Sequence, residues 1–82
     1  MVDAKFDSKF QLAVTKIKDA EVHKSVKNKI SKIIENPEIG KPMRNIRKGT
    51  REVYVGHYRL SYAYYKNKNL IEFLEFYHKD EQ

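Results

Sequence analysis

The chain has 82 residues, with 17 Lys or Arg against 11 Asp or Glu, a net charge of +6 and a pI near 9.6. A chain of this length is expected to form one small domain over residues 1–82, and its charge favours an anionic partner: RNA, DNA or an acidic protein segment. The absence of cysteine excludes a disulfide framework and a thiolate metal site. With no apolar run long enough for a signal peptide or a membrane span, we expect a cytoplasmic protein without membrane association.

The first half of the chain has the periodicity of two helices. We expect a short strand at residues 2–6, followed by a first helix capped by Asp7 or Ser8. A second helix, from about 20 to 36, is predicted by a cap at Asp19 and by one apolar stripe. The stripe consists of Val22, Val26, Ile30, Ile33 and Ile34. The short linker between the helices favours an antiparallel hairpin.

The second half of the chain has the alternation of strands. Strands are predicted at residues 43–46, 51–55, 58–65 and 70–77, joined by short turns, and the strongly apolar last strand is expected near the centre of the sheet. The predicted fold class is therefore α+β, with an N-terminal helical hairpin packed on one face of a small, mostly antiparallel sheet. The other face is expected to be free.

Strand alternation predicts which side chains reach the free face. If Leu60 points toward the helices, Arg59 and Ser61 must point away, because neighbouring strand residues face opposite sides. In the last strand, the same alternation divides the apolar residues into two groups. It separates Leu70, Leu74 and Phe76 from Ile71, Phe73 and Tyr77.

The segment from Lys41 to Arg51 is basic and contains no acidic residue. Its cations are suited to following a phosphate backbone, although a solvated loop on a basic protein is the ordinary alternative. Tyr54, just after this segment, could contact a base, although core packing is the better explanation for most of the tyrosines. The candidate RNA-binding residues are Lys41, Arg44, Arg47, Lys48, Arg51 and Tyr54.

Arg59 is the strongest candidate for phosphate recognition, because a strand holds its guanidinium and the guanidinium can bind a phosphate through two hydrogen bonds. The alternative is an ion pair with an acidic neighbour from among Glu52, Glu72 and Glu75. His57 and His78 are candidate proton donors or acceptors, since histidine exchanges a proton near neutral pH, or else simply a turn residue and a strand-end residue. The sequence contains no glycine-rich phosphate loop and no His, Asp and Glu cluster at metal-binding spacing, so we expect no cofactor and no metal.

The order of these motifs resembles the RelE/ParE toxin superfamily of type II toxin–antitoxin modules. The resemblance covers nearly the whole chain. It is carried by Ile33-Ile34-Glu35-Asn36-Pro37, by Gly40-Lys41-Pro42-Met43-Arg44, by Tyr54-Val55-Gly56-His57-Tyr58-Arg59-Leu60-Ser61-Tyr62 and by a closing strand into His78.

The resemblance implies a microbial RNase-like fold and an antitoxin that wraps the toxin. In the RelE branch such proteins cleave mRNA in the ribosomal A site, and in the ParE branch they poison DNA gyrase. Arg59 matches the family arginine that stabilises the transition-state phosphate, and Lys79, beside His78, falls near a second family arginine. The catalytic candidates are therefore Arg59, His78 and Lys79.

One departure from the family pattern concerns the strand before Tyr-Arg-Leu. The RNase branch often has two lysines there, where this chain has Glu52 and Tyr54. The favoured interpretation is a RelE-like toxin, either a ribosome-dependent mRNA endoribonuclease or a weakened descendant, held in a hetero-oligomer by a cognate antitoxin. The alternatives are a ParE-like gyrase inhibitor without enzymatic activity and a non-toxic adaptor for nucleic acid or protein on the same fold.

Overall fold

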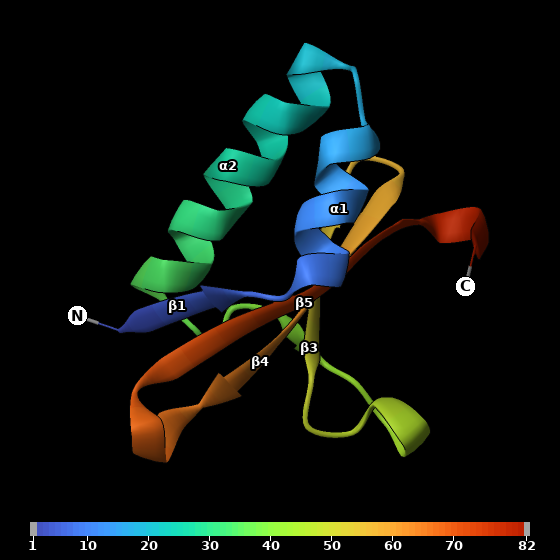
Figure 1. Ribbon diagram of the computed structural model, residues 1–82. Helices are drawn as coiled ribbons and strands as arrows, with labels where there is room; N and C mark the ends of the chain where they lie inside the picture. Colours follow the sequence, from blue (N-terminus) through green and yellow to red (C-terminus); the bar gives the residue numbers. More distant parts are fainter. Residues whose placement is uncertain (1, 82) are drawn as a thin grey trace.

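The protein is an α+β structure in which two helices cover one face of a five-stranded sheet, as the computed structural model of residues 2–81 shows (Figure 1). In chain order the elements are β1 (Asp3–Phe6), α1 (Ser8–Lys16), α2 (Ala20–Glu35), β2 (Lys41–Pro42), η1 (Asn45–Arg47), β3 (Arg51–Val55), β4 (Tyr58–Tyr65), η2 (Lys66–Lys68), β5 (Leu70–His78) and η3 (Lys79–Glu81). The strand order across the sheet is β1-β5-β4-β3-β2. This architecture confirms the predicted fold class.

Both α-helices begin where the sequence predicts. The carboxylates of Asp7 and Asp19 each accept a hydrogen bond from the backbone amide two residues further on, at 2.8 and 2.9 Å, and so satisfy a donor that the helix leaves unpaired. α2 ends before Asn36, because Pro37 disfavours a helical conformation in the preceding residue. Within residues 2–81, neither helix has the length and apolar character needed to cross a membrane.

β5 lies inside the sheet, as predicted from its apolar sequence. It pairs with β4 in antiparallel and with β1 in parallel orientation, so the N-terminal strand forms one edge of the sheet. The ring of Phe6 on β1 stacks on that of Phe73 on β5, with 4.9 Å between the ring centres. The buried side chains between the sheet and the helices include Phe10, Val26, Ile33, Leu60, Tyr62, Ile71, Phe73 and Phe76.

A β-bulge changes the alternation along β5. Ser61 pairs with Glu75, but the next residue of β4, Tyr62, pairs with Phe73, so Leu74 is an extra residue in β5. An extra residue shifts every later side chain to the opposite face. The predicted division of the β5 apolar residues is therefore wrong. Ile71, Phe73 and Phe76 face the helices together.

The sheet face away from the helices, called the open face below, presents two cross-strand rows of side chains. Arg59 and Ser61 point to this face, as predicted, and each is flanked by a residue of β3 and a residue of β5. The first row is Tyr54, Arg59 and Tyr77. The second row is Glu52, Ser61 and Glu75.

The predicted strand at residues 43–46 is wrong. Of the segment between α2 and β3, Lys41 and Pro42 form the strand that pairs with β3, after which the chain leaves the extended conformation. Asn45 and Gly49 have positive φ values of 61° and 97°, which turn the backbone into a compact loop containing η1. This η1 loop, residues 43–50, is closed by a hydrogen bond from the Met43 amide to the Thr50 carbonyl at 3.0 Å.

Tyr62 attaches the connection between α2 and β2 to the core. Its side chain is fully buried, and its hydroxyl donates to the Pro37 carbonyl at 2.8 Å and accepts from the Gly40 amide at 2.9 Å. Burial raises the pKa of the Tyr62 phenol. A Cβ at Gly40 would lie 2.7 Å from the Tyr62 hydroxyl oxygen, so only glycine permits this close approach.

We expect Tyr62→Phe to lower the free energy of unfolding by about 1–3 kcal/mol, because it leaves the buried Gly40 amide and Pro37 carbonyl without this partner. Urea denaturation would measure the loss. Tyr64→Phe, on the same strand and the same face, is the control and should have a smaller effect, since Tyr64 is only partly buried. Equal losses for the two variants would contradict this role of the Tyr62 hydroxyl.

Candidate functional site

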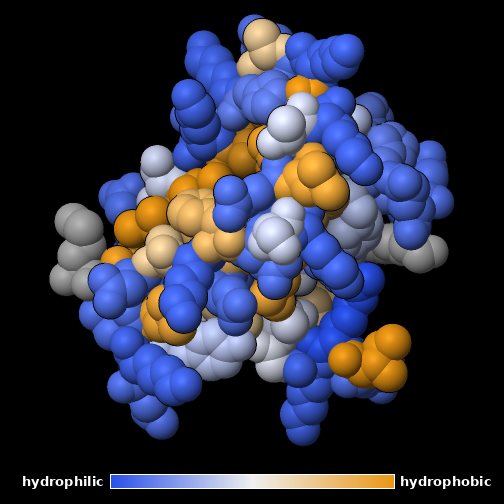
Figure 2. Space-filling model, viewed as in Figure 1, coloured by the Kyte–Doolittle hydropathy of each residue, from blue (hydrophilic) through white to orange (hydrophobic). Residues whose placement is uncertain are grey.

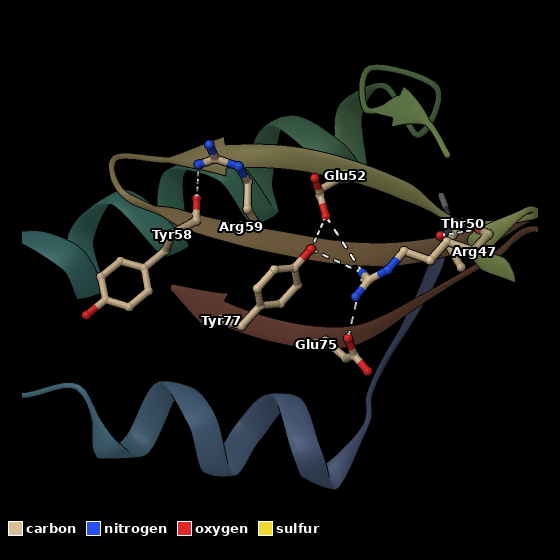
Figure 3. Close-up of polar contacts among 7 residues, drawn as sticks. All are labelled: Arg47, Thr50, Glu52, Tyr58, Arg59, Glu75 and Tyr77. Carbon is tan, nitrogen blue, oxygen red and sulfur yellow. Dashed lines mark hydrogen bonds and ion pairs between the residues drawn. The ribbon is translucent and has the colours of Figure 1, made fainter. Parts of the chain in front are cut away.

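Arg59 lies on the open face against an exposed tyrosine. Its guanidinium carbon is 3.8 Å from the centre of the Tyr54 ring, and one guanidinium nitrogen donates to the Tyr58 carbonyl at 3.0 Å (Figure 3). The cation–π contact and the hydrogen bond together hold the arginine on the sheet. Among residues 2–81, Arg59 forms no ion pair with Glu52, Glu72 or Glu75. Its charge is therefore not neutralised by these acids, as phosphate recognition requires.

Arg47 reaches from η1 onto the open face and contacts two carboxylates. One of its guanidinium nitrogens donates to the Tyr77 hydroxyl at 3.1 Å and lies 3.9 Å from oxygens of both Glu52 and Glu75 (Figure 3). The Tyr77 hydroxyl in turn donates a hydrogen bond to Glu52. Because Glu52 is only 7% exposed, these contacts supply the partners that a buried carboxylate needs.

The η1 loop is thereby fastened to the sheet while other side chains of the loop remain exposed. The Thr50 hydroxyl donates to the Arg47 carbonyl at 2.7 Å, which stiffens the loop behind the guanidinium. Arg44 and Lys48 are exposed on either side of η1. The loop projects at the lower right of Figures 1 and 2, where hydrophilic groups surround a protruding hydrophobic one, and Ile46 of this loop is fully exposed. It presents cations on a braced support.

The predicted basic segment does not form one surface. The guanidinium of Arg51 donates to the Glu38 and Gly40 carbonyls at 3.0 and 2.8 Å, and so it stabilises the turn after α2. Arg51 pairs across the ladder with Tyr62, which places it on the face opposite Arg59. Lys41 is exposed at the edge of the sheet.

Lys41 and Tyr54 both line a groove between α2 and the edge of the sheet. The groove has a volume of about 360 Å³. Lys29 and Lys32 of α2 line it as well, so it carries lysines on two of its sides. This groove adjoins Tyr54, and through Tyr54 it adjoins Arg59.

His78 and Lys79 do not lie beside Arg59. His78 pairs with Tyr58, a position that faces the helices, and its ring centre lies 6.1 Å from that of His57. Its Nδ1 atom is 3.5 Å from a carboxylate oxygen of Asp80. Lys79 begins η3 and is exposed. Of the three residues predicted to be catalytic, only Arg59 lies on the open face within a strand.

The sequence interpretation did not identify the cluster of Arg47, Glu52 and Tyr77. The sequence suggests Glu52 as a partner of Arg59 or in place of a family lysine, and Arg47 as an RNA-binding cation, but neither as a partner of the other. The alternation along β3 could have indicated that Glu52 lies on the same face as Tyr54. Tyr77 gave no comparable signal, because the bulge at Leu74 reverses its expected orientation.

Comparison with known proteins shows which family the chain belongs to. The family model described as the ParE toxin of type II toxin–antitoxin systems, parDE, matches residues 4–82. The chain belongs to this toxin family. No curated protein sequence matches it.

Solved toxins share the fold. One chain of the toxin–antitoxin complex RelBE2 from Mycobacterium tuberculosis superposes with a TM-score of 0.81 at 22% identity, and the match covers 94% of this chain and 96% of that one. A chain of the intact E. coli RelBE complex superposes with a TM-score of 0.80 at 18% identity, covering 95% of this chain and 96% of that one. YafQ from E. coli strain BL21(DE3) superposes with a TM-score of 0.73 at 22% identity, covering 99% of this chain and 97% of that one. The resemblance to the RelE/ParE superfamily is thus confirmed, and this toxin has the RelE fold.

We expect Arg47→Ala to lower the free energy of unfolding of this toxin by about 1–3 kcal/mol, because Glu52 keeps its buried charge but loses its cation. Urea denaturation would measure the change. Arg44→Ala, an exposed arginine on the same loop, should stay within about 0.5 kcal/mol of the wild type. If both variants have the same stability as the wild type, the Arg47 contacts do not brace the loop.

Proposed function

We propose that this toxin is a RelE-like endoribonuclease that binds RNA on its open face and cuts mRNA on the ribosome. The observation that carries the proposal is the position of Arg59, which is held on a strand by Tyr54 and is not paired with the acids of the sheet. A guanidinium held in this way can bind a phosphate and stabilise the charge that develops during cleavage. The proposed reaction is attack of the ribose 2′-oxygen on the adjacent phosphorus, with release of the 5′-oxygen.

The surrounding residues suit the handling of a nucleic-acid chain. Arg44, Lys48 and Lys41 are exposed cations that can contact neighbouring phosphates. The exposed ring of Tyr54 can support a base as well as the guanidinium of Arg59. Arg47 and Arg51 contribute mainly by holding the loops that carry these groups.

His78 and Lys79 remain a sequence-based proposal for proton transfer or charge neutralisation. Both lie at the C-terminal end of β5, and His78 is on the helix side of the sheet. RNA bound to Arg59 would have to extend past the end of the sheet to meet them. We therefore assign them to a flanking phosphate rather than to the phosphate that Arg59 holds.

We further propose that a cognate antitoxin silences this protein in the cytoplasm by forming a hetero-oligomer with it. The proposal is supported by membership of a type II toxin–antitoxin family. The similar structures from M. tuberculosis and E. coli are themselves toxin–antitoxin complexes. A net charge of +6 also suits a partner with acidic segments.

We expect induced expression of the wild-type chain to arrest growth and to produce cuts in translated mRNA that follow the codon phase. Arg59→Ala should lower the cleavage rate by about 100- to 1,000-fold, the usual effect of removing one electrostatic donor to a transition state. Primer extension on mRNA from induced cells measures both. Lys68→Ala is a matched control, because Lys68 also lies over a tyrosine ring, Tyr65, but at 5.8 Å and beyond the end of β4.

A gyrase supercoiling assay run in parallel separates the two toxin branches. Trapped, cleaved DNA without cuts in mRNA would contradict RNA cleavage and identify a ParE-like gyrase inhibitor. Neither effect, together with normal growth, would identify a non-toxic adaptor. Arg59→Ala with undiminished mRNA cleavage would remove Arg59 from the proposed site while leaving the toxin activity in place.

We expect RNA affinity to weaken as salt rises, because binding to phosphates releases condensed counterions. Lys48→Ala should reduce the slope of log affinity against log salt by about 1 if Lys48 contacts one phosphate. Fluorescence anisotropy with a labelled RNA at several salt concentrations provides the slope. Lys24→Ala, an exposed lysine on α2, is the control and should leave the slope unchanged. An affinity independent of salt would exclude the proposed phosphate contacts.

A further inference from the structure

The hydroxyl of Tyr77 lies over the middle of the open face, in a position that the proposed phosphate contact does not use. The side chain starts on β5 and its hydroxyl reaches Glu52 on β3, so it crosses β4 between them (Figure 3). It can cross because the β4 residue of the Glu52 row is Ser61, a small side chain that is itself buried. The hydroxyl is thus brought above the strand that carries Arg59.

We propose that Tyr77 is a catalytic residue of this toxin that transfers the proton of the ribose 2′-hydroxyl, and that Glu52 is a positioning residue that orients the Tyr77 hydroxyl and receives its proton. The inference rests on the proposed RNA cleavage and deepens it by naming the groups that handle the proton. It also gives a role to Glu52, which lies at a sheet position where the resemblance leads us to expect a lysine in the RNase branch.

The position of Tyr77 relative to Arg59 is the first support. The two residues are directly opposite each other on β5 and β4, on the same face. Side chains in such a pair start about 4.5–5.5 Å apart. The Arg59 guanidinium lies over Tyr54 of β3, and the Tyr77 hydroxyl bonds Glu52, two residues earlier on the same strand. Residues two apart in a strand are about 7 Å from each other, so one bound nucleotide can contact both groups.

The hydrogen bonds of Tyr77 are the second support. Its hydroxyl hydrogen points to the buried Glu52 carboxylate, and its oxygen accepts from the Arg47 guanidinium at 3.1 Å. The Glu52 carboxylate is thus placed to receive the Tyr77 proton, and the Arg47 cation lies at the oxygen that releases it. Arg47 would also stabilise the partial negative charge that develops on the phenol oxygen while the proton moves.

The proposed step is balanced without a metal or another reactant. As the 2′-oxygen forms its bond to phosphorus, its proton passes to the Tyr77 oxygen while the Tyr77 proton passes to Glu52. The bond between phosphorus and the 5′-oxygen then breaks, and the proton returns from Glu52 through Tyr77 to the 5′-oxygen. The products are a 2′,3′-cyclic phosphate and a free 5′-hydroxyl. Arg59 stabilises the charge on the phosphate throughout.

The same face contains a matched control pair. The Tyr65 hydroxyl donates to the Glu72 carboxylate at 3.2 Å, which reproduces the tyrosine–glutamate bond at the opposite end of the sheet. No arginine contacts this pair among residues 2–81. Tyr65→Phe and Glu72→Gln thus remove the same chemical groups at a distance from Arg59.

Single-turnover cleavage of mRNA on programmed ribosomes, with purified wild-type toxin and variants, tests the inference. Tyr77→Phe should lower the cleavage rate constant by about 100- to 10,000-fold, the range for general acid–base groups. RNA affinity, measured separately by anisotropy, should be unchanged, since the lost group acts on the proton and not on binding. Glu52→Gln should also slow cleavage, and Glu52→Asp, which keeps a carboxylate, should recover part of the rate.

The outcomes separate this inference from the function on which it rests. Absence of mRNA cuts by the wild type overturns both. Cuts by the wild type with an undiminished rate for Tyr77→Phe overturn the role of Tyr77 alone. Equal rate losses for Tyr65→Phe and Tyr77→Phe would do the same. If Tyr77→Phe proves unfolded by circular dichroism, Glu52→Gln decides. A lower rate constant in a Glu52→Gln variant that is as stable in urea as Glu52→Asp and binds RNA equally well supports the role, and an undiminished rate constant, or a loss that follows the loss of stability, overturns it.

Discussion

Side chains along β4 and β5 must alternate between the helices and the open face, and the extra residue Leu74 reverses that alternation partway along β5. Before the bulge, Ile71 and Phe73 complete the core. After it, Phe76 returns to the core and Tyr77 turns to the open face. Without the bulge, Phe76 would be exposed and Tyr77 would be buried. The hydrophobic core and the position of Tyr77 beside Arg59 therefore depend on the same backbone irregularity.

The distribution of charge follows from this arrangement. The chain is strongly basic, yet the centre of its open face contains the buried carboxylate of Glu52, which would be unfavourable without partners. Arg47 and Tyr77 supply those partners, and in doing so they attach the η1 loop to the sheet. The cations thus divide into arginines that stabilise the fold and exposed residues that are available to a ligand. Arg59 stands apart because it stacks on Tyr54 instead of pairing with an acid.

The similar toxins share the fold with this chain at identities of only 17–22%. A fold supports different activities, so the side chains of the site have to carry the functional argument. Here Arg59 matches the strand arginine expected from the resemblance, and Glu52 and Tyr54 stand roughly where the RNase branch is expected to have lysines. Tyr54 orients Arg59, and Glu52 binds Tyr77. The substitutions are consistent with one another because both support groups on the same face.

The sequence by itself determined the helix caps at Asp7 and Asp19 and the end of α2 before Pro37, because these depend on neighbouring residues. It also determined the extent of β3 and β4 and the orientation of Arg59, because these depend on simple periodicity. Tertiary structure alone decided the bulge at Leu74, the η1 loop in place of a strand, the separation of His78 from Arg59, and the contact of Arg47 with Glu52. These features arise from contacts between residues distant in sequence. A shift of one residue in strand register, set by core packing, is enough to move a side chain from one face of the sheet to the other.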